Sequence, residues 1–122
     1  NNIKLKENFY IVIKHRNSVE TWSKLPQVFN NGIISYDFII DSSQAYGNNL
    51  LNKNGRWCIY SGDINQDGAI DSTDLMLVFY ENINGSIGYI QSDLNGDMFC
   101  EIEDIVISFK NYMLNIRKQK PE

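Results

Sequence analysis

Two twelve-residue segments of this chain repeat the same pattern of acidic and amide residues, and no other feature constrains the fold as strongly. The first is DINQDGAIDSTD, residues 63–74, and the second is DLNGDMFCEIED, residues 93–104, at an offset of 30 residues. Aligned without a gap, both have Asp at positions 1, 5 and 12, Asn at position 3 and an acid at position 9. One such segment can arise by chance, but two in register indicate an internal repeat.

The oxygen-bearing side chains occupy the ligand positions of an EF-hand calcium loop. In that loop, positions 1, 3, 5, 9 and 12 supply side-chain oxygens and position 7 supplies a backbone carbonyl. Ca²⁺ takes about six to eight oxygens at about 2.3 to 2.6 Å, so alternate residues of a tightly curled loop must turn their oxygens inward. The alternative is that Asx-rich turns only cap helices. We predict two calcium sites, with Ala69 and Phe99 acting through their carbonyls, and the ligands are Asp63, Asn65, Asp67, Ala69, Asp71, Asp74, Asp93, Asn95, Asp97, Phe99, Glu101 and Asp104.

The two loops differ at position 6, where the sharp turn favours a residue without a Cβ. Gly68 occupies this position in the first loop, and Met98 occupies it in the second. A left-handed conformation at a non-glycine residue costs about 1 to 2 kcal/mol, which corresponds to about a tenfold weaker site. Gly96, two residues earlier, would allow the second loop to curl differently.

Each loop is followed by a segment with helical periodicity but is not preceded by one. The first loop is reached from the strand-like RWCIYSG, and the second from NGSIGYIQS, which Gly85 and Gly88 interrupt. A full EF-hand has a helix on both sides of its loop, so we predict a loop followed by a helix, twice. The apolar residues with helical spacing are Leu75, Val78 and Phe79 after the first loop, and Ile105, Phe109, Tyr112, Met113 and Ile116 after the second.

This duplicated arrangement resembles a type I-like dockerin domain, the small calcium-binding module of bacterial cellulosomes. The family signature is a duplicated DxNxDGxIxxxD loop with only the exiting helix, and the first loop matches every fixed position. The match covers residues 63 to about 116. The segments YIVIKHRNSVETWS and AYGNN are similar to the β region that precedes dockerin-type repeats in secreted multidomain proteins of Bacteroidetes-like and Ignavibacteria-like bacteria.

The resemblance implies a protein–protein interaction. A dockerin docks onto a cohesin domain and attaches a secreted enzyme, often one that degrades polysaccharides, to a scaffold. Loop positions 10 and 11 form part of that docking surface. The two repeats differ there, which argues against the rotated, two-way binding of symmetric dockerins, and Ser72 also has the ordinary alternative role of a helix N-cap. The implied partner-binding residues are Ser72, Thr73, Ile102 and Glu103.

Residues 1–62 have the composition of an antiparallel β region. Runs rich in β-branched and aromatic residues lie at 9–14, 18–22, 33–40 and 56–60, between turn-forming pairs such as Asn54-Gly55. About four strands are too few for a β-sandwich, which usually has about seven. We therefore expect an α+β chain in which residues 1–62 are the end of a larger β-sandwich, residues 63–116 are the dockerin-like domain and residues 117–122 are a tail.

The charge pattern favours a cation over a nucleic acid as the partner of the second half. Residues 63–104 contain ten acidic residues and no Lys, Arg or His, although the whole chain carries a net charge of only −4. Nucleic-acid binding requires clustered Lys and Arg. The longest apolar run, residues 75–80, has six residues, whereas a membrane span needs about 20. Calcium loops favour a secreted or cell-surface location.

Other chemistry has weaker support in the sequence. The one histidine, His15, has no second His and no catalytic Ser or Cys nearby with which to form a nucleophilic site, so we predict that this chain is not an enzyme and that any hydrolase lies upstream. Cys58 and Cys100 allow one disulfide, but Cys100 at position 8 of the second loop is equivalent to Ile70 and also fits as a small core residue.

Two functional hypotheses remain. In the first, the chain is a cohesin-binding anchor. In the second, calcium only staples the end of an extracellular protein, and packing of the helices against residues 1–62 takes the place of a partner. In either case the continuous apolar run at 75–80 must pack against the β region or a partner, because an isolated surface helix would have a polar face.

Overall fold

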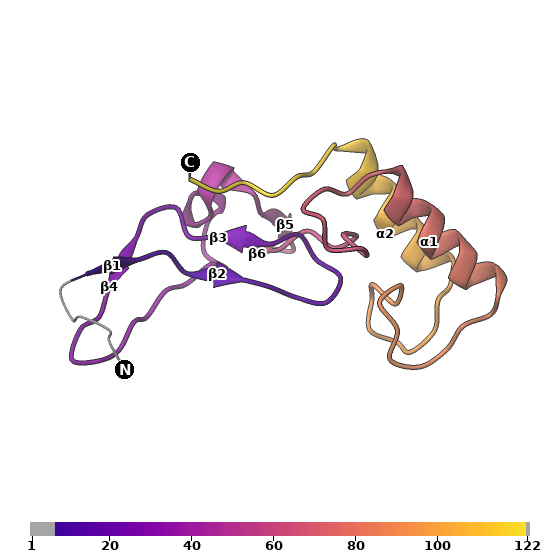
Figure 1. Cartoon of the computed structure of the whole chain (residues 1–122), viewed down its shortest axis with the longest axis horizontal. Helices are drawn as coiled ribbons and strands as arrows, with labels where there is room; N and C mark the ends of the chain where they lie inside the picture. Colours follow the sequence, from indigo (N-terminus) through magenta and orange to yellow (C-terminus); the bar gives the residue numbers. More distant parts are fainter. Residues whose placement is uncertain (1–6, 122) are drawn as a thin grey trace.

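The computed structural model describes residues 7–121 and shows an elongated α+β protein (Figure 1). Short strands and turns make up one end of the molecule, and two helices lie side by side at the other. The elements are β1 (Asn8–Phe9), β2 (Val12–Ile13), β3 (Thr21–Trp22), β4 (Gln27–Val28), η1 (Ser42–Gln44), η2 (Tyr46–Asn48), β5 (Leu51–Lys53), β6 (Arg56–Cys58), α1 (Ser72–Ile83) and α2 (Ile102–Met113).

The strands form three antiparallel pairs. β1 pairs with β4, β2 with β3, and β5 with β6. The β5–β6 hairpin turns at Asn54-Gly55, where both residues have positive φ angles of 54° and 85°. These angles suit a type I′ turn, whose twist matches that of the flanking strands. Within the described residues, the three pairs do not join into the two packed sheets of a sandwich.

The predicted strand at 33–40 is wrong. Ile33, Ile39 and Ile40 are exposed, and the segment has only an isolated bridge between Asn30 and Ile33. The side chain of Asp37 accepts a hydrogen bond from the Ile39 N–H at 2.9 Å, which bends the chain locally. β-branched residues favour a strand only where a neighbouring strand pairs with them. Strands β4 and β5, which are two and three residues long, lie outside the predicted β runs.

The helices begin at acidic caps supplied by the loops. Asp71 is the N-cap of α1, and its side chain accepts from the Thr73 N–H at 3.0 Å. The N-cap role considered for Ser72 is therefore wrong, because Ser72 is already the first helical residue. α1 and α2 run antiparallel and pack against each other (Figure 1). The core residues of this half are Ile64, Val78, Cys100 and Ile105, flanked by Ile90 and Leu94.

Cys100 is a core residue and its thiol is free. The thiol of Cys58 is also free, but Cys58 is exposed. The Cys100 Sγ lies 3.4 Å from the Val78 carbonyl oxygen between the helices. Burial raises the pKa of the Cys100 thiol to about 11, and the carboxylate of Asp104 acts in the same direction. The prediction that Cys100 serves as a small apolar residue is confirmed.

Candidate metal centre

The first loop brings three carboxylates together. One oxygen from each of Asp63, Asp67 and Asp74 lies within 4.8 Å of the other two. Asp63 and Asp74 are buried, whereas Asp67 faces solvent. Asp74 belongs to the first turn of α1, so the helix fixes the last carboxylate of the loop in place.

Hydrogen bonds to backbone N–H groups hold the loop in its curl. The two carboxylate oxygens of Asp63 accept from Asp67 at 3.2 Å and from Gly68 at 3.0 Å. Asp74 Oδ1 accepts from the Ile64 N–H at 2.8 Å, and Asp74 Oδ2 accepts from the Asp71 N–H at 3.0 Å. Each carboxylate thus keeps its orientation toward the centre of the loop.

The second loop repeats this arrangement. Asp93, Asp97 and Asp104 form the matching group, and one carboxylate oxygen from each again lies within 4.8 Å of the other two. Asp93 and Asp104 are buried, whereas Asp97 is exposed. Asp93 accepts from the N–H groups of Asp97 at 3.1 Å and Met98 at 2.8 Å. Asp104 accepts from Leu94 at 2.7 Å through the same oxygen that Asp74 uses for Ile64 in the first loop. The internal repeat of the sequence is therefore also a repeat in space.

Position 6 takes the same backbone conformation in both loops. Gly68 has a φ of 91° and Met98 has a φ of 72°. The expectation that Gly96 makes the second loop curl differently is wrong, because Gly96 at 81° matches Gln66 at 60° at position 4 of the first loop. Met98 therefore carries the left-handed conformation that glycine adopts without strain.

The remaining predicted ligands lie around the two groups of three. Asn65 and Asn95 each accept from the N–H of the Asp two residues later at 3.2 Å, so their side chains are turned into the loops. Asp71 and Glu101 at position 9 are the helix N-caps and fall outside the close groups. In EF-hand loops this position often reaches the ion through a water molecule. Ala69 and Phe99 stand at position 7, one residue before the buried Ile70 and Cys100.

Burial makes the negative charge of the first loop unfavourable in the chain alone. It raises the pKa of Asp63 to about 6, and the carboxylates of Asp74 and Asp67 act in the same direction against the Gly68 hydrogen bond. Burial also raises the pKa of Asp74, and Asp71 adds to the effect. A bound divalent cation would reverse both effects. The chemistry of this donor set, carboxylate and amide oxygens only, fits a hard cation such as Ca²⁺.

Each loop forms a short backbone pairing with the segment that follows the helix of the other repeat. The Lys118 N–H donates to the Gly68 carbonyl at 2.6 Å, and the Ile70 N–H donates to the Ile116 carbonyl at 2.9 Å. The chain after α2 thus runs back past the first loop (Figure 1). This segment continues into the predicted tail, where Gln119 forms an isolated β-bridge with Thr21 of β3.

The second loop has the equivalent pairing from the chain that follows α1. The Gly88 N–H donates to the Met98 carbonyl at 2.6 Å, and the Cys100 N–H donates to the Ser86 carbonyl at 3.2 Å. These positions are related to Lys118 and Ile116 by the offset of 30 residues. Neither pairing was predicted from the sequence, because SIG at 86–88 and IRK at 116–118 differ at every equivalent position.

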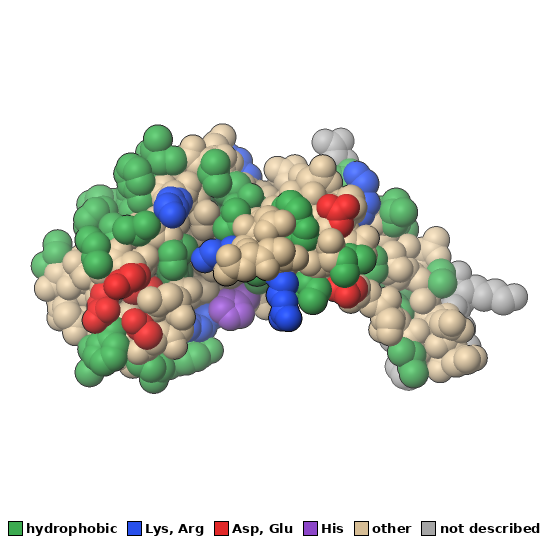
Figure 2. All heavy atoms as spheres, turned by 180° about the vertical axis from the view of Figure 1, so that it is seen from behind, with side chains coloured by type: hydrophobic (Ala, Val, Ile, Leu, Met, Phe, Trp, Pro, Cys, Tyr) green, Lys and Arg blue, Asp and Glu red, His purple; other side chains and the backbone are tan. Residues whose placement is uncertain are grey.

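The four predicted partner-binding residues are all exposed, and all lie in the first turns of the helices. Figure 2 shows that hydrophobic side chains gather over the helical end of the molecule. The β region does not cover the exposed side chains of the apolar run at 75–80. The exposed apolar residues of the helices are Met76, Leu77, Phe79, Tyr80 and Ile83 on α1, and Ile102, Val106, Phe109 and Met113 on α2.

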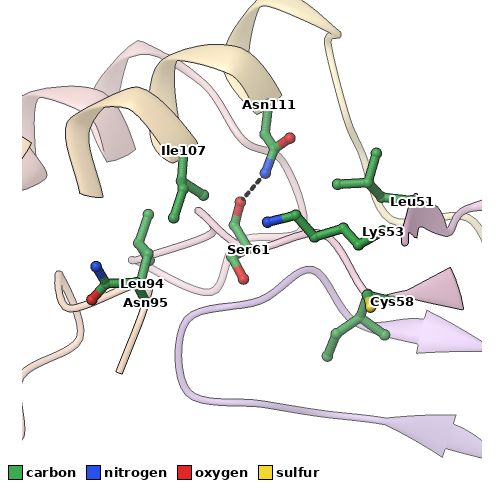
Figure 3. Close-up of a pocket in the computed structure, with 9 residues that line it drawn as sticks. Leu51, Lys53, Cys58, Ser61, Leu94, Asn95, Ile107 and Asn111 are labelled. Atoms are coloured by element: carbon green, nitrogen blue, oxygen red, sulfur yellow. Dashed lines mark hydrogen bonds between the residues drawn. The ribbon is translucent and has the colours of Figure 1, made fainter. Parts of the chain in front are cut away.

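A cavity of about 320 Å³ lies where the β5–β6 hairpin meets α2 (Figure 3). Asn111 closes one side by donating its Nδ2 to the Ser61 carbonyl at 2.7 Å. None of the described residues that line this cavity is an acid or a histidine. His15 lies elsewhere, with its Nδ1 3.1 Å from the Asn17 Oδ1.

The chain has no match among models of known protein families, curated proteins or solved structures. Neither described helix has the length and apolar character that a membrane crossing requires. The two close groups of aspartates are compatible with two metal sites.

Proposed function

We propose that the C-terminal half is a calcium-binding, dockerin-like docking module that anchors a secreted or cell-surface protein to a cohesin-type partner. The observation that carries this proposal is the pair of matching aspartate groups, each with its last aspartate in the first turn of a helix. Two Ca²⁺ ions would offset part of the negative charge of residues 63–104, which contain ten acidic residues and no basic residue. Metal binding and helix docking would then be coupled, because like charges oppose the compact metal-free state.

The outer faces of the helices supply the docking surface in this proposal. Met76, Tyr80 and Ile83 are exposed at a spacing of four and three residues, which places them on one face of α1. Phe109 and Met113 form a similar stripe on α2. Exposed apolar patches of this kind mark protein–protein interfaces. Ser72, Thr73, Ile102 and Glu103 lie at the loop ends of these stripes, where calcium would hold them.

Biolayer interferometry against a panel of cohesin domains tests the docking role. We expect saturable binding in calcium, loss of binding in EGTA, and at least about a tenfold loss with Tyr80→Lys, because aromatic residues dominate interface energies. Ile33→Lys is the matched control, since Ile33 is equally exposed but lies in the β region. Equal effects of the two substitutions would exclude docking through the helices. Binding that persists in EGTA would exclude a docking role that depends on calcium.

A calcium staple without a cohesin partner is the second candidate, and contacts between the loops and the β region favour it. Gln66 of the first loop donates its Nε2 to the Ser18 carbonyl at 3.2 Å, and Asn111 of α2 donates to Ser61. Under this hypothesis no cohesin binds, and calcium raises the melting temperature of the whole chain in a single transition. Separate transitions for the β region and the helices would argue against the staple.

A further inference from the structure

The backbone carbonyl two residues before each loop accepts a hydrogen bond from a side-chain amide. Before the first loop this carbonyl belongs to Ser61, and its donor is Asn111 of α2 at 2.7 Å (Figure 3). The equivalent carbonyl before the second loop belongs to Gln91, at the repeat offset of 30 residues. The donor that the repeat would place there is residue 81 of α1, which corresponds to Asn111.

Residue 81 is Glu81, whose carboxyl group has no N–H to donate. It instead accepts from the hydroxyl of Ser86. The missing donor comes from the β region: the Asn17 Nδ2 donates to the Gln91 carbonyl at 3.0 Å and to the carbonyl of Asp93, the first residue of the second loop, at 3.1 Å. An amide from outside the repeat thus occupies the role that Asn111 has at the first loop.

Asn17 is held rigidly in this position. It is only 2% exposed, and its backbone carbonyl accepts from the Gly62 N–H at 2.7 Å. The adjacent Arg16 donates to the Ile90 carbonyl and stacks 4.2 Å from the centre of the Tyr89 ring. The Gln91 Nε2 returns a hydrogen bond to the Arg16 carbonyl at 3.0 Å. The turn between β2 and β3 is therefore fastened to the chain leading into the second loop.

We infer that Asn17 is a positioning residue for the second calcium site, which the repeat alone leaves incomplete. This inference rests on the proposed calcium binding. Asn17 acts through Asp93, because its amide fixes the backbone from which the first carboxylate of the loop projects. Outer partners of metal ligands commonly contribute about 10- to 100-fold to metal affinity. By linkage, Ca²⁺ in the second loop strengthens the attachment of the β2–β3 turn by the same factor.

The test is a calcium titration of the full chain followed by NMR, with the amide signals of Gly68 and Met98 reporting the first and second loop. Asn17→Ala is expected to weaken calcium binding about tenfold at the second loop and less than about twofold at the first. Asn111→Ala is the matched control and is expected to show the opposite selectivity. The unaffected loop in each sample verifies that the variant is folded.

A rescue variant separates the amide's role from general packing. Glu81 and Gln91 line the same cavity, so Glu81→Asn in the Asn17→Ala background places an amide at the position equivalent to Asn111. We expect it to restore second-loop affinity by about threefold or more. Equal weakening of both loops by Asn17→Ala, no weakening, or no rescue would overturn the inference. If neither loop of the parent chain responds to calcium, the proposed function itself fails.

Discussion

Replacing Met98 with glycine should tighten calcium binding at the second loop. Met98 is held at a φ of 72°, and its counterpart Gly68 has a φ of 91° in the same hydrogen-bonding environment. We expect carboxylate repulsion to favour looser conformations of the second loop when no metal is bound, so that the strain at Met98 opposes metal binding. The substitution removes that strain at the moment of binding.

The size of the effect follows from two opposing contributions. A left-handed conformation costs a non-glycine residue about 1 to 2 kcal/mol, and the greater freedom of glycine in the relaxed chain offsets about 0.5 to 1 kcal/mol of the gain. The Met98 side chain is 49% exposed, so little apolar burial is lost. The net gain of about 0.5 to 1 kcal/mol corresponds to about two- to fivefold tighter binding.

Isothermal titration calorimetry with a competing chelator measures this change. The reverse substitution, Gly68→Ala in the first loop, is the matched control. Its added Cβ would lie 3.4 Å from the Lys118 Cβ, an ordinary contact, so strain is again the main cost. We expect about two- to fivefold weaker binding at the first loop. Unchanged or weaker calcium binding by Met98→Gly would refute the argument from backbone strain.

Two further predictions concern the closing segment and the core. Deleting residues 116–122 removes the backbone partners of Gly68 and Ile70 and should weaken the proposed calcium site in the first loop about tenfold, with the proposed second site changed less than about twofold; equal loss at both sites in the NMR titration would count against this. Val78→Ala should lower the free energy of unfolding in calcium by about 1 to 2 kcal/mol, measured by urea denaturation. Its control, the exposed Val106→Ala, should change it by less than about 0.5 kcal/mol, and similar losses for both would place the core elsewhere.

The aspartates of the candidate sites could be predicted because the required information is local. Asp63, Asp67 and Asp74 lie within twelve residues, and the geometry of oxygen coordination fixes their spacing. The same spacing correctly located the starts of both helices, since the last carboxylate of each loop lies in the first helical turn.

The contacts that complete the sites could not be predicted, because they join distant segments. Asn17 lies 76 residues before Asp93, and no pattern in the sequence connects the two. The pairing of Lys118 with Gly68 depends on backbone groups, which leave no signature in residue type. The wrong strand at 33–40 has a related cause, since β propensity specifies a strand only when a partner is available.

Calcium titration calorimetry of the full, chelator-treated chain tests the central claim most directly. We expect two Ca²⁺ ions per chain, a loss of one with Asp67→Ala, and a loss of the other with Asp97→Ala, because these residues contribute one carboxylate to each group. A titration without heat and without any change in helical circular dichroism, or a stoichiometry that neither substitution alters, would contradict the account.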